Sequence, residues 1–359
     1  MPRSALALLA IALILLPFAV ACQKRKKPPR PVAAGSSSSG GGPVDPVEAV
    51  ERARAAASAS ASSAGAAGAA GSEAFRKAFA LHDAGCAAGD FSACVDLGID
   101  YEEGRGVEAD VVKAVPLYKR GCDHRIAAGC SNLGQLYDRG DGVSKDLAAA
   151  AGFYRRGCEG GSPLGCNDLG LDCKDGIGVA QDDAQAARLF RKACDLGSPD
   201  GCTNLGYMRS TGRGVPADGA LAVELYRRGC EAGSGQGCHN LAYRYEHGID
   251  VEKSERAALP LYEKACSLGV SGACDNMGGL YERSLEIPHD ADKAVGLYAR
   301  ACAMNDATGC NNVGHMYELG QGVQQDDAKA ASYYKRACDG GLALGCTNLG
   351  QLQRSGRAP

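Results

Sequence analysis

The chain has 359 residues, 50 of them glycine, a formal net charge of −3, only 6% aromatic residues and no tryptophan. This composition excludes a single large aromatic core and favours many small contacts between Ala- and Gly-rich elements. Residues 1–35 hold six of the 39 Lys and Arg residues and no acid, so the remainder has 33 basic and 42 acidic residues, and its net charge of −9 argues against a nucleic-acid partner.

The first residues have the layout of a signal peptide. A short basic start precedes the 12-residue apolar stretch 5–16, which is too short for a comfortable membrane span. The small residues before Cys22 resemble the lipobox of bacterial lipoproteins, with Ala19 where leucine is commonest. The resemblance implies a signal peptide over 1–21, acylation of Cys22 and, with Gln23 following, an outer-membrane lipoprotein. A plain signal peptide with a periplasmic or secreted product is the alternative.

Residues 22–71 are predicted to be the lipidated cysteine and a disordered linker, because Pro, Ser, Gly and Ala dominate them and cannot bury a core. The basic cluster 24–27 could lie against anionic lipid headgroups or belong to a solvated spacer. Because only Arg3 precedes the apolar stretch, the cluster is also compatible with an uncleaved anchor that leaves the remainder in the cytoplasm.

Residues 72–359 contain a repeat with a period of 36 residues. Two cysteines recur in every unit, eight positions apart, with no insertion or deletion. The first cysteines are Cys86, Cys122, Cys158, Cys194, Cys230, Cys266, Cys302 and Cys338, and the second are Cys94, Cys130, Cys166, Cys202, Cys238, Cys274, Cys310 and Cys346. An Asx residue follows the second cysteine by two positions, and a small residue follows two positions later.

Each unit is predicted to form two helices. In one unit, Leu133, Leu136 and Tyr137 make an apolar stripe at i, i+3 and i+4. The glycines in "RGDGV" (139–143) then break the chain, and Asp146 is placed to cap the second helix. The pattern predicts sixteen helices, from a second-type helix over 73–85 to a first-type helix over about 344–354.

The stretch "NLGQLYDRGDGV", followed by a helix ending in "FYRRGC", resembles the Sel-one-like repeat, a relative of the tetratricopeptide repeat. The paired cysteines are similar to a cysteine-rich bacterial subclass. The resemblance covers about 80–354 and implies an all-α fold, a right-handed α-α superhelical solenoid of 36-residue helix hairpins. The sequence departs from the pattern at "SLEI" (284–287), and at Pro116 and Pro260, where we expect a kinked or late-starting helix.

The cysteine spacing favours one disulfide per repeat. The first cysteine ends one helix and the second begins the next, so each spacing spans an inter-helix turn where the side chains can approach. A rival pairing across 28 residues, such as Cys94 with Cys122, would leave Cys86 and Cys346 unpaired at the two ends. Eight local bridges, each worth about 2.5 kcal/mol in the chain-entropy model, therefore fit the array better. They also favour export from the reducing cytosol.

No pattern in the sequence points to a cofactor or a resident metal. Zinc sites favour cysteines two to four residues apart, which this array lacks, and the six histidines form no H-E-x-x-H spacing. Cys173, the one unpaired array cysteine, is predicted to fill a buried tyrosine position.

Members of the cysteine-rich subclass have been labelled β-lactamases. "SYYK" (332–335) matches the Ser-x-x-Lys element of serine β-lactamases, but Ser-Asp-Asn and Lys-Thr-Gly are missing. The chain is therefore predicted not to be an enzyme, with a β-lactamase or penicillin-recognising enzyme as the alternative.

The residues that vary between units lie on a stripe of the first helices, which by analogy with tetratricopeptide-like solenoids line a concave groove. The predicted partner-binding residues are Gln135, Tyr207, His239, Tyr243, Glu246 and His315, because aromatic and polar side chains together make good hot spots. The same residues could instead merely solvate a face. The Asx column is predicted to cap the first helix or to bond between repeats.

The sequence thus predicts an exported, lipid-anchored, monomeric scaffold that binds a protein or peptide at the bacterial cell envelope. A purely structural spacer is a third possibility.

Overall fold

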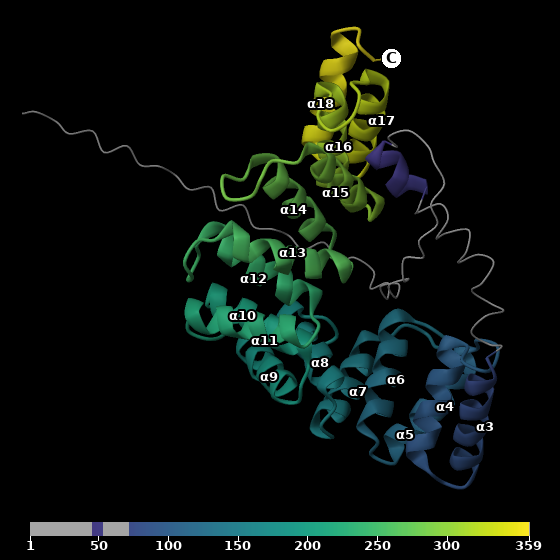
Figure 1. Cartoon of the computed structure of the whole chain (residues 1–359). Coiled ribbons are helices and arrows are strands. Elements are labelled where there is room, and N and C mark those ends of the chain that lie inside the picture. The colour runs from purple at the N-terminus through teal and green to yellow at the C-terminus, as the bar shows by residue number, and fades with distance from the viewer. Residues whose placement is uncertain (1–44, 53–71, 359) are drawn as a thin grey trace, which may run out of the picture. The chain divides into compact units, whose positions relative to one another are not determined.

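The computed structural model of the protein describes residues 45–52 and 72–358 (Figure 1). Every regular element within these residues is a helix, and residues 73–354 form the sixteen helices α3–α18 that the period predicts. The predicted signal peptide, Cys22 and most of the predicted linker lie outside the described residues.

The sixteen helices are of two alternating kinds. The first helices of the repeats are α4 (Phe91–Glu103), α6 (Ala127–Arg139), α8 (Pro163–Asp175), α10 (Pro199–Thr211), α12 (Gly235–His247), α14 (Ser271–Arg283), α16 (Ala307–Leu319) and α18 (Ala343–Arg354). The second helices are α3 (Glu73–Ala87), α5 (Val111–Asp123), α7 (Leu147–Glu159), α9 (Asp183–Asp195), α11 (Gly219–Glu231), α13 (Glu255–Ser267), α15 (Ala291–Ala303) and α17 (Asp327–Asp339).

Each helix packs against the next one in the chain, and first helices of successive repeats also touch. Contacts of this kind, made only between neighbours, define a solenoid of helix hairpins. Its core is a column of buried aromatic rings on the second helices, each at most 3% exposed: Tyr118, Tyr154, Phe190, Tyr226, Tyr262, Tyr298 and Tyr334.

The small residue that follows each Asx residue by two positions, here called the small column, leaves room for one of these rings. A Cβ atom on Gly134 would lie 2.8 Å from the ring of Tyr154, closer than carbon atoms approach. The turn glycines have a different role: Gly178 adopts φ +68°, and a Cβ there would lie 2.1 Å from the carbonyl oxygen of Leu147 on the preceding repeat. Glycine therefore allows both the packing within a hairpin and the packing between hairpins.

The second helices begin at side-chain caps. The Asp146 carboxylate accepts a hydrogen bond of 2.9 Å from the Ala149 N–H, as the sequence predicts. The predicted late start at Pro116 and Pro260 is wrong: α5 and α13 begin at the same register as the other second helices, because Asp110 and Ser254 cap them in the usual way.

Eight disulfides join the cysteines that stand eight residues apart, the same pairs that the spacing favours. They are Cys86–Cys94, Cys122–Cys130, Cys158–Cys166, Cys194–Cys202, Cys230–Cys238, Cys266–Cys274, Cys302–Cys310 and Cys338–Cys346. Their Cα atoms lie 4.4–4.9 Å apart. Each bridge links a second helix to the first helix that follows, so the staples lie between repeats.

The turn at 284–287 replaces the left-handed glycine of other repeats with Ser284 in an extended conformation. The Ser284 hydroxyl donates to the Glu255 carboxylate at 2.5 Å and accepts from the N–H groups of Glu286 and Ile287. A side-chain hydroxyl thus organises the turn that has neither glycine, whereas the turn at 248–251 keeps Gly248 and has Asp250 at φ +58° in place of the second glycine.

Part of the predicted linker is structured, which corrects the expectation of disorder for that part. Residues 46–52 form a helix, and Val47 in it is only 1% exposed. Asp45 caps this helix through the Val47 N–H at 2.9 Å, and Pro46 follows at the first helical position. The sequence analysis did not predict this short capped helix, because Pro, Ser, Gly and Ala dominate the segment around it.

Candidate partner-binding surface

Three of the predicted partner-binding residues are exposed on first helices. Tyr207 on α10 is 42% exposed, Tyr243 on α12 is 43% exposed, and His315 on α16 is also exposed. The Tyr243 ring stacks on His247 with the ring centroids 4.1 Å apart. A partner can therefore contact these half-exposed aromatic rings without separating the helices of the array.

Glu246 has an internal partner. The Tyr262 hydroxyl donates to its carboxylate at 2.5 Å. The same bond, across 16 residues, joins Tyr118 to Glu102, Tyr298 to Glu282 and Tyr334 to Glu318. Burial, followed by the adjacent Glu246 carboxylate, raises the pKa of Tyr262, so the phenol stays a donor. Glu246 is therefore part of the frame of the repeat.

One repeat lacks this pair in both members. Phe190 occupies the aromatic position, and Lys174 stands 16 residues earlier, where five other repeats have an acid and the repeat of Tyr226 has Ser210. This repeat thus lacks both the tyrosine hydroxyl and the carboxylate that would accept its hydrogen bond. This joint replacement agrees with the pair acting as one structural unit.

His239 also lies inside the array. Its Nε2 is 3.2 Å from the Asn276 amide nitrogen of the next repeat, and its ring centroid is 5.7 Å from that of Tyr262. Burial lowers the pKa of His239, which favours the neutral ring. Tyr262 thus brings His239 and Glu246 together by contacting both of them, within the packing of the repeats.

The Asx column bonds between repeats, as one of its two predicted roles required. Asn204, Asn312 and Asn348 each donate to a side chain 37 residues earlier, namely Asn167, Asp275 and Asn311. Gln135 takes part in a related bond, because its amide donates to the Asp168 carboxylate at 3.1 Å. Of the six predicted residues, Gln135, His239 and Glu246 therefore have structural partners.

Two arginines that the sequence pattern did not single out lie near the exposed tyrosines. Arg213, in the turn after α10, pairs with Asp183 at 2.7 Å and also approaches the Tyr207 side chain. Arg244, next to Tyr243, pairs with Asp250 and lies over the Tyr226 ring at 5.9 Å. Tyrosine and arginine together are the residue types most enriched in binding hot spots.

In "SYYK" (332–335), the serine and the lysine each contact a group other than the other one. The Ser332 hydroxyl donates to the Lys329 carbonyl oxygen at 3.0 Å, and the Lys335 ammonium pairs with Asp339 at 3.0 Å. No group of three or more potential metal ligands occurs in residues 45–52 and 72–358. Cys173 is buried in the core as predicted, and burial raises the pKa of its thiol.

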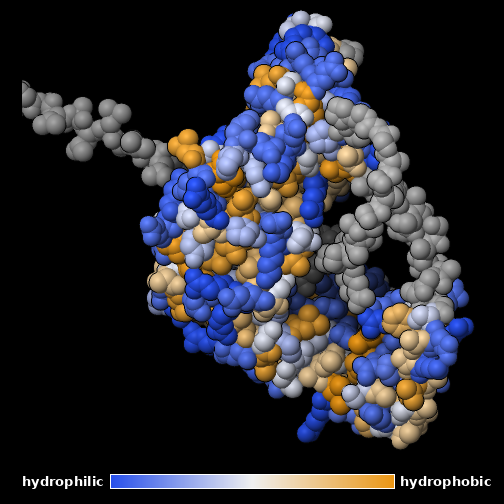
Figure 2. Space-filling view, viewed as in Figure 1, coloured by the Kyte–Doolittle hydropathy of each residue, from blue (hydrophilic) through white to orange (hydrophobic). Residues whose placement is uncertain are grey.

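The visible surface is mixed in character. Figure 2 shows hydrophobic residues scattered among hydrophilic ones on the face it presents, rather than gathered in one large area. In the part of the chain that the structure describes, no helix is both long enough and apolar enough to cross a membrane.

Comparison with protein families matches the Sel1 repeat seven times, at residues 91–125, 127–162, 163–198, 199–234, 235–270, 271–306 and 307–342. Comparison with curated proteins finds no match.

Two solved structures share the fold. The protein is similar to c5321, a protective antigen of uropathogenic Escherichia coli with an SLR fold, at 29% identity and a TM-score of 0.60; the match covers 76% of this chain and spans 58% of the antigen. It is also similar to a Sel1 repeat protein from Oxalobacter formigenes, at 24% identity and a TM-score of 0.61, over 68% of this chain and 96% of the other.

Proposed function

Because the chain belongs to the Sel1 repeat family, whose members typically mediate protein–protein interaction, we propose that it is a scaffold that binds a protein or peptide through exposed first-helix residues. The supporting observation is a repeated frame with a variable stripe. The aromatic column, the small column and the disulfides recur in every repeat, while the stripe changes from Tyr207 and Tyr243 to His315. A rigid frame lets such residues bind at a small entropic cost.

The proposed binding residues are Tyr207, Tyr243 and His315. Arg213 and Arg244 support the two tyrosines, because they pair with Asp183 and Asp250 within the array. Gln135, His239 and Glu246 remain in the proposal only as residues that support the surface, because their side chains bond within the array. The partner is a polypeptide that lies along the first helices and presents groups complementary to phenol and imidazole, such as backbone carbonyls and carboxylates.

The proposed location is the bacterial cell envelope, with the chain exported, acylated at Cys22 and monomeric. Disulfides in every repeat support an oxidising, extracytoplasmic compartment. Acylation is tested by growing cells that express the chain with an alkyne-tagged fatty acid. Label should enter the wild-type protein and not Cys22→Ser; equal labelling of both would refute the anchor.

The binding proposal is tested with a random peptide library displayed on phage and selected on the oxidised chain. Enriched peptides should lose at least about tenfold in affinity for Tyr207→Ala/Tyr243→Ala, as expected when two hot-spot side chains are removed. Val112→Ala is the matched control, because Val112 is 63% exposed on a second helix. Peptides that bind all three proteins equally would refute the assignment of the surface.

A further inference from the structure

The helix 46–52, with its cap Asp45, is bound to the last complete repeat, far away in the sequence. We refer to residues 45–52 as the clasp. Val47 is buried among Val295, Tyr298 and other residues of the C-terminal core, and Val50 packs against its edge. The apolar face of the clasp is therefore continuous with the core of the repeats that it covers.

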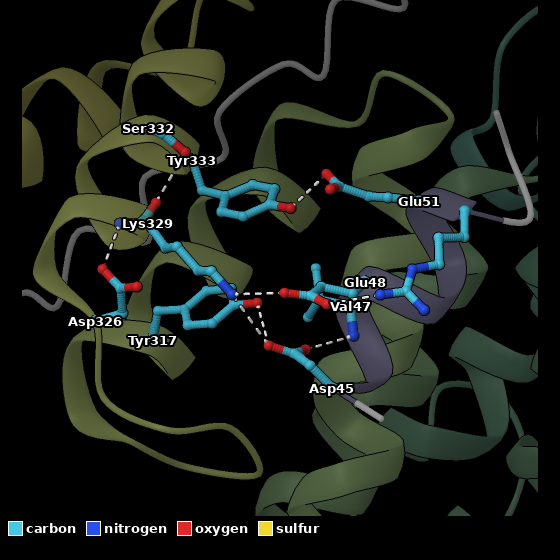
Figure 3. A network of polar contacts seen from close by, with 10 residues as sticks. Asp45, Val47, Glu48, Glu51, Tyr317, Asp326, Lys329, Ser332 and Tyr333 are labelled. Carbon is cyan, nitrogen blue, oxygen red and sulfur yellow. Dashed lines mark hydrogen bonds and ion pairs between the residues drawn. The ribbon is translucent and has the colours of Figure 1, made fainter. Parts of the chain in front are cut away.

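The polar contacts of the clasp match three carboxylates to four donors, of which Figure 3 labels Tyr317, Lys329 and Tyr333. The Tyr317 hydroxyl donates to Asp45 at 2.8 Å, and the Lys329 ammonium lies 3.3 Å from Asp45 and 3.2 Å from Glu48. The third carboxylate, Glu51, accepts from the Tyr333 hydroxyl at 2.5 Å and pairs with Arg336 at 3.3 Å. The acids recur every three residues, which places them along one side of the helix.

The donors also contact one another and the preceding repeat. The Tyr317 and Tyr333 rings stack with their centroids 5.8 Å apart. Lys329 lies over the Tyr317 ring at 4.9 Å, and Arg336 lies over the Tyr333 ring at 5.1 Å. Arg336 also donates to the Cys302 carbonyl oxygen of the preceding repeat. Two stacked phenols with a cation over each form a group of hydrogen-bond donors suited to carboxylates.

This combination of residues is particular to one repeat. Tyr333 stands where the other repeats have Leu117, Phe153, Leu189, Leu225, Leu261 and Leu297, so only α17 among the second helices α5–α17 offers a hydroxyl there. Two repeats are near counterparts: Lys113 lies over the Tyr101 ring and Lys293 over the Tyr281 ring, each at 5.2 Å. In both, a leucine (Leu117 or Leu297) takes the place of the second tyrosine. The site is therefore more than a by-product of the repeat pattern.

We propose that Tyr317, Lys329, Tyr333 and Arg336 form a binding site for a short acidic helix, and that the chain's own residues 45–52 occupy it as an intramolecular clasp. A partner helix with acids at i, i+3 and i+6 and valines at i+2 and i+5 would have to displace the clasp. This site involves second helices and the side of α16 that bears Tyr317, so it is separate from the proposed surface around Tyr207 and Tyr243.

Electrostatics of the bound state agree with this arrangement. Burial tends to raise the pKa of Asp45, but hydrogen bonds from Tyr317, from the Val47 N–H and from Lys329 outweigh it and lower the pKa overall. The carboxylate therefore stays ionised beside Lys329. The exposed ion pairs of the clasp are individually weak, and a seven-residue helix is not stable alone. Such a clasp can be displaced by a competitor.

The test uses the full oxidised chain and a fluorescent peptide with the sequence of residues 43–54. Fluorescence anisotropy compares the wild type with Val47→Asp/Glu51→Lys, in which the clasp is disabled. At an effective concentration of about 1 mM and a peptide Kd of about 100 μM, the clasp would weaken peptide binding by about tenfold. The clasp-disabled chain should therefore bind the peptide about tenfold more tightly.

Further substitutions in the clasp-disabled chain separate the site from general charge effects. Lys329→Ala and Tyr333→Leu should each lower the affinity at least about fivefold, since each removes a charge-assisted bond. Both introduce residues that other repeats carry at these positions, so the fold should be kept. Lys113→Ala, in one counterpart repeat, should change nothing.

Equal binding to the wild type and the clasp-disabled chain would overturn the clasp, and failure of the peptide to bind either would overturn the site. A wild-type dimer in light scattering that becomes a monomer in Val47→Asp/Glu51→Lys would assign the segment to a second copy, and would overturn intramolecular occupancy.

Discussion

The pair Tyr262–Glu246 offers a direct test of whether Glu246 belongs to the frame. In Tyr262→Phe, the Glu246 carboxylate loses its 2.5 Å donor while its side chain is only 23% exposed. A hydrogen bond to a charged group contributes about 1.5–3 kcal/mol when buried. Because Glu246 can still reach some water, we expect a loss of about 1.5 kcal/mol in the free energy of unfolding.

Glu246→Lys changes the other member of the pair and leaves the hydroxyl of the fully buried Tyr262 without an acceptor. We expect it to lower the free energy of unfolding by about 1–2 kcal/mol. The double variant Tyr262→Phe/Glu246→Lys reproduces the natural combination of Phe190 with Lys174. Removing both partners together is nearly neutral. The Asn276 amide also donates to the Tyr262 hydroxyl at 3.2 Å, but it keeps its contact with His239 when that hydroxyl is removed. The double variant should therefore lie within about 0.5 kcal/mol of the wild type. The coupling energy would then be about 2–3 kcal/mol.

The assay is urea denaturation of the oxidised chains followed by far-UV circular dichroism. Hydrogen exchange at the amides of α12 accompanies it, because repeat arrays need not unfold in one step. Costs that simply add in the double variant would refute the pair as a structural unit. Glu246 would then return to the candidate binding residues.

Three further outcomes are expected. Burial, followed by the nearby charge of Asp306, raises the pKa of Asp275 to about 6 from 3.8. The folded chain therefore holds more protons between these values, and stability should fall by about 2–3 kcal/mol as pH rises through that window. Asp275→Asn should remove this fall, as measured by thermal melting at several pH values, and an unchanged pH profile would contradict the assignment. The variant should keep the fold, since Asn167 and Asn311 make the same bond in other repeats. Cys194→Ala/Cys202→Ala should lower the free energy of unfolding by about 2.5 kcal/mol for a nine-residue loop, and a loss below about 0.5 kcal/mol in urea denaturation would mean that the bridge does not restrain the unfolded chain. Burial raises the pKa of Cys173, so iodoacetamide should label it in urea but hardly at all in the native protein, as measured by mass spectrometry; rapid native labelling would place it at the surface.

The 36-residue period was sufficient to predict the repeats, because one recurring unit allows few arrangements. The cysteines mark the junctions between helices, the Gly column marks the seat of each aromatic ring, and Asp146 and its equivalents mark helix starts. Of the two alternatives predicted at Pro116 and Pro260, a kink or a late start, the late start was wrong. Pro116 and Pro260 do not delay their helices, because the caps and the packing of the repeat set the start.

The candidate site was harder to predict because its contacts join residues that are 16, 37 or more positions apart in the sequence. His239 and Glu246 looked like groove residues, yet Asn276 and Tyr262 hold them within the array. The joint replacement of tyrosine and acid at Phe190 and Lys174 was a signal in the sequence that could have identified this pair. The clasp had a weaker signal, the "DPVE" start of a capped helix, and nothing local in the chain indicated where it would bind.

Peptide mapping of the exported chain under non-reducing conditions is the most direct test of the covalently stapled array. After proteolysis and mass spectrometry, the account predicts eight linked pairs, each joining cysteines eight residues apart from Cys86–Cys94 to Cys338–Cys346. Free thiols at these positions, or links across 28 residues such as Cys94 to Cys122, would contradict both the oxidising location and the rigid frame.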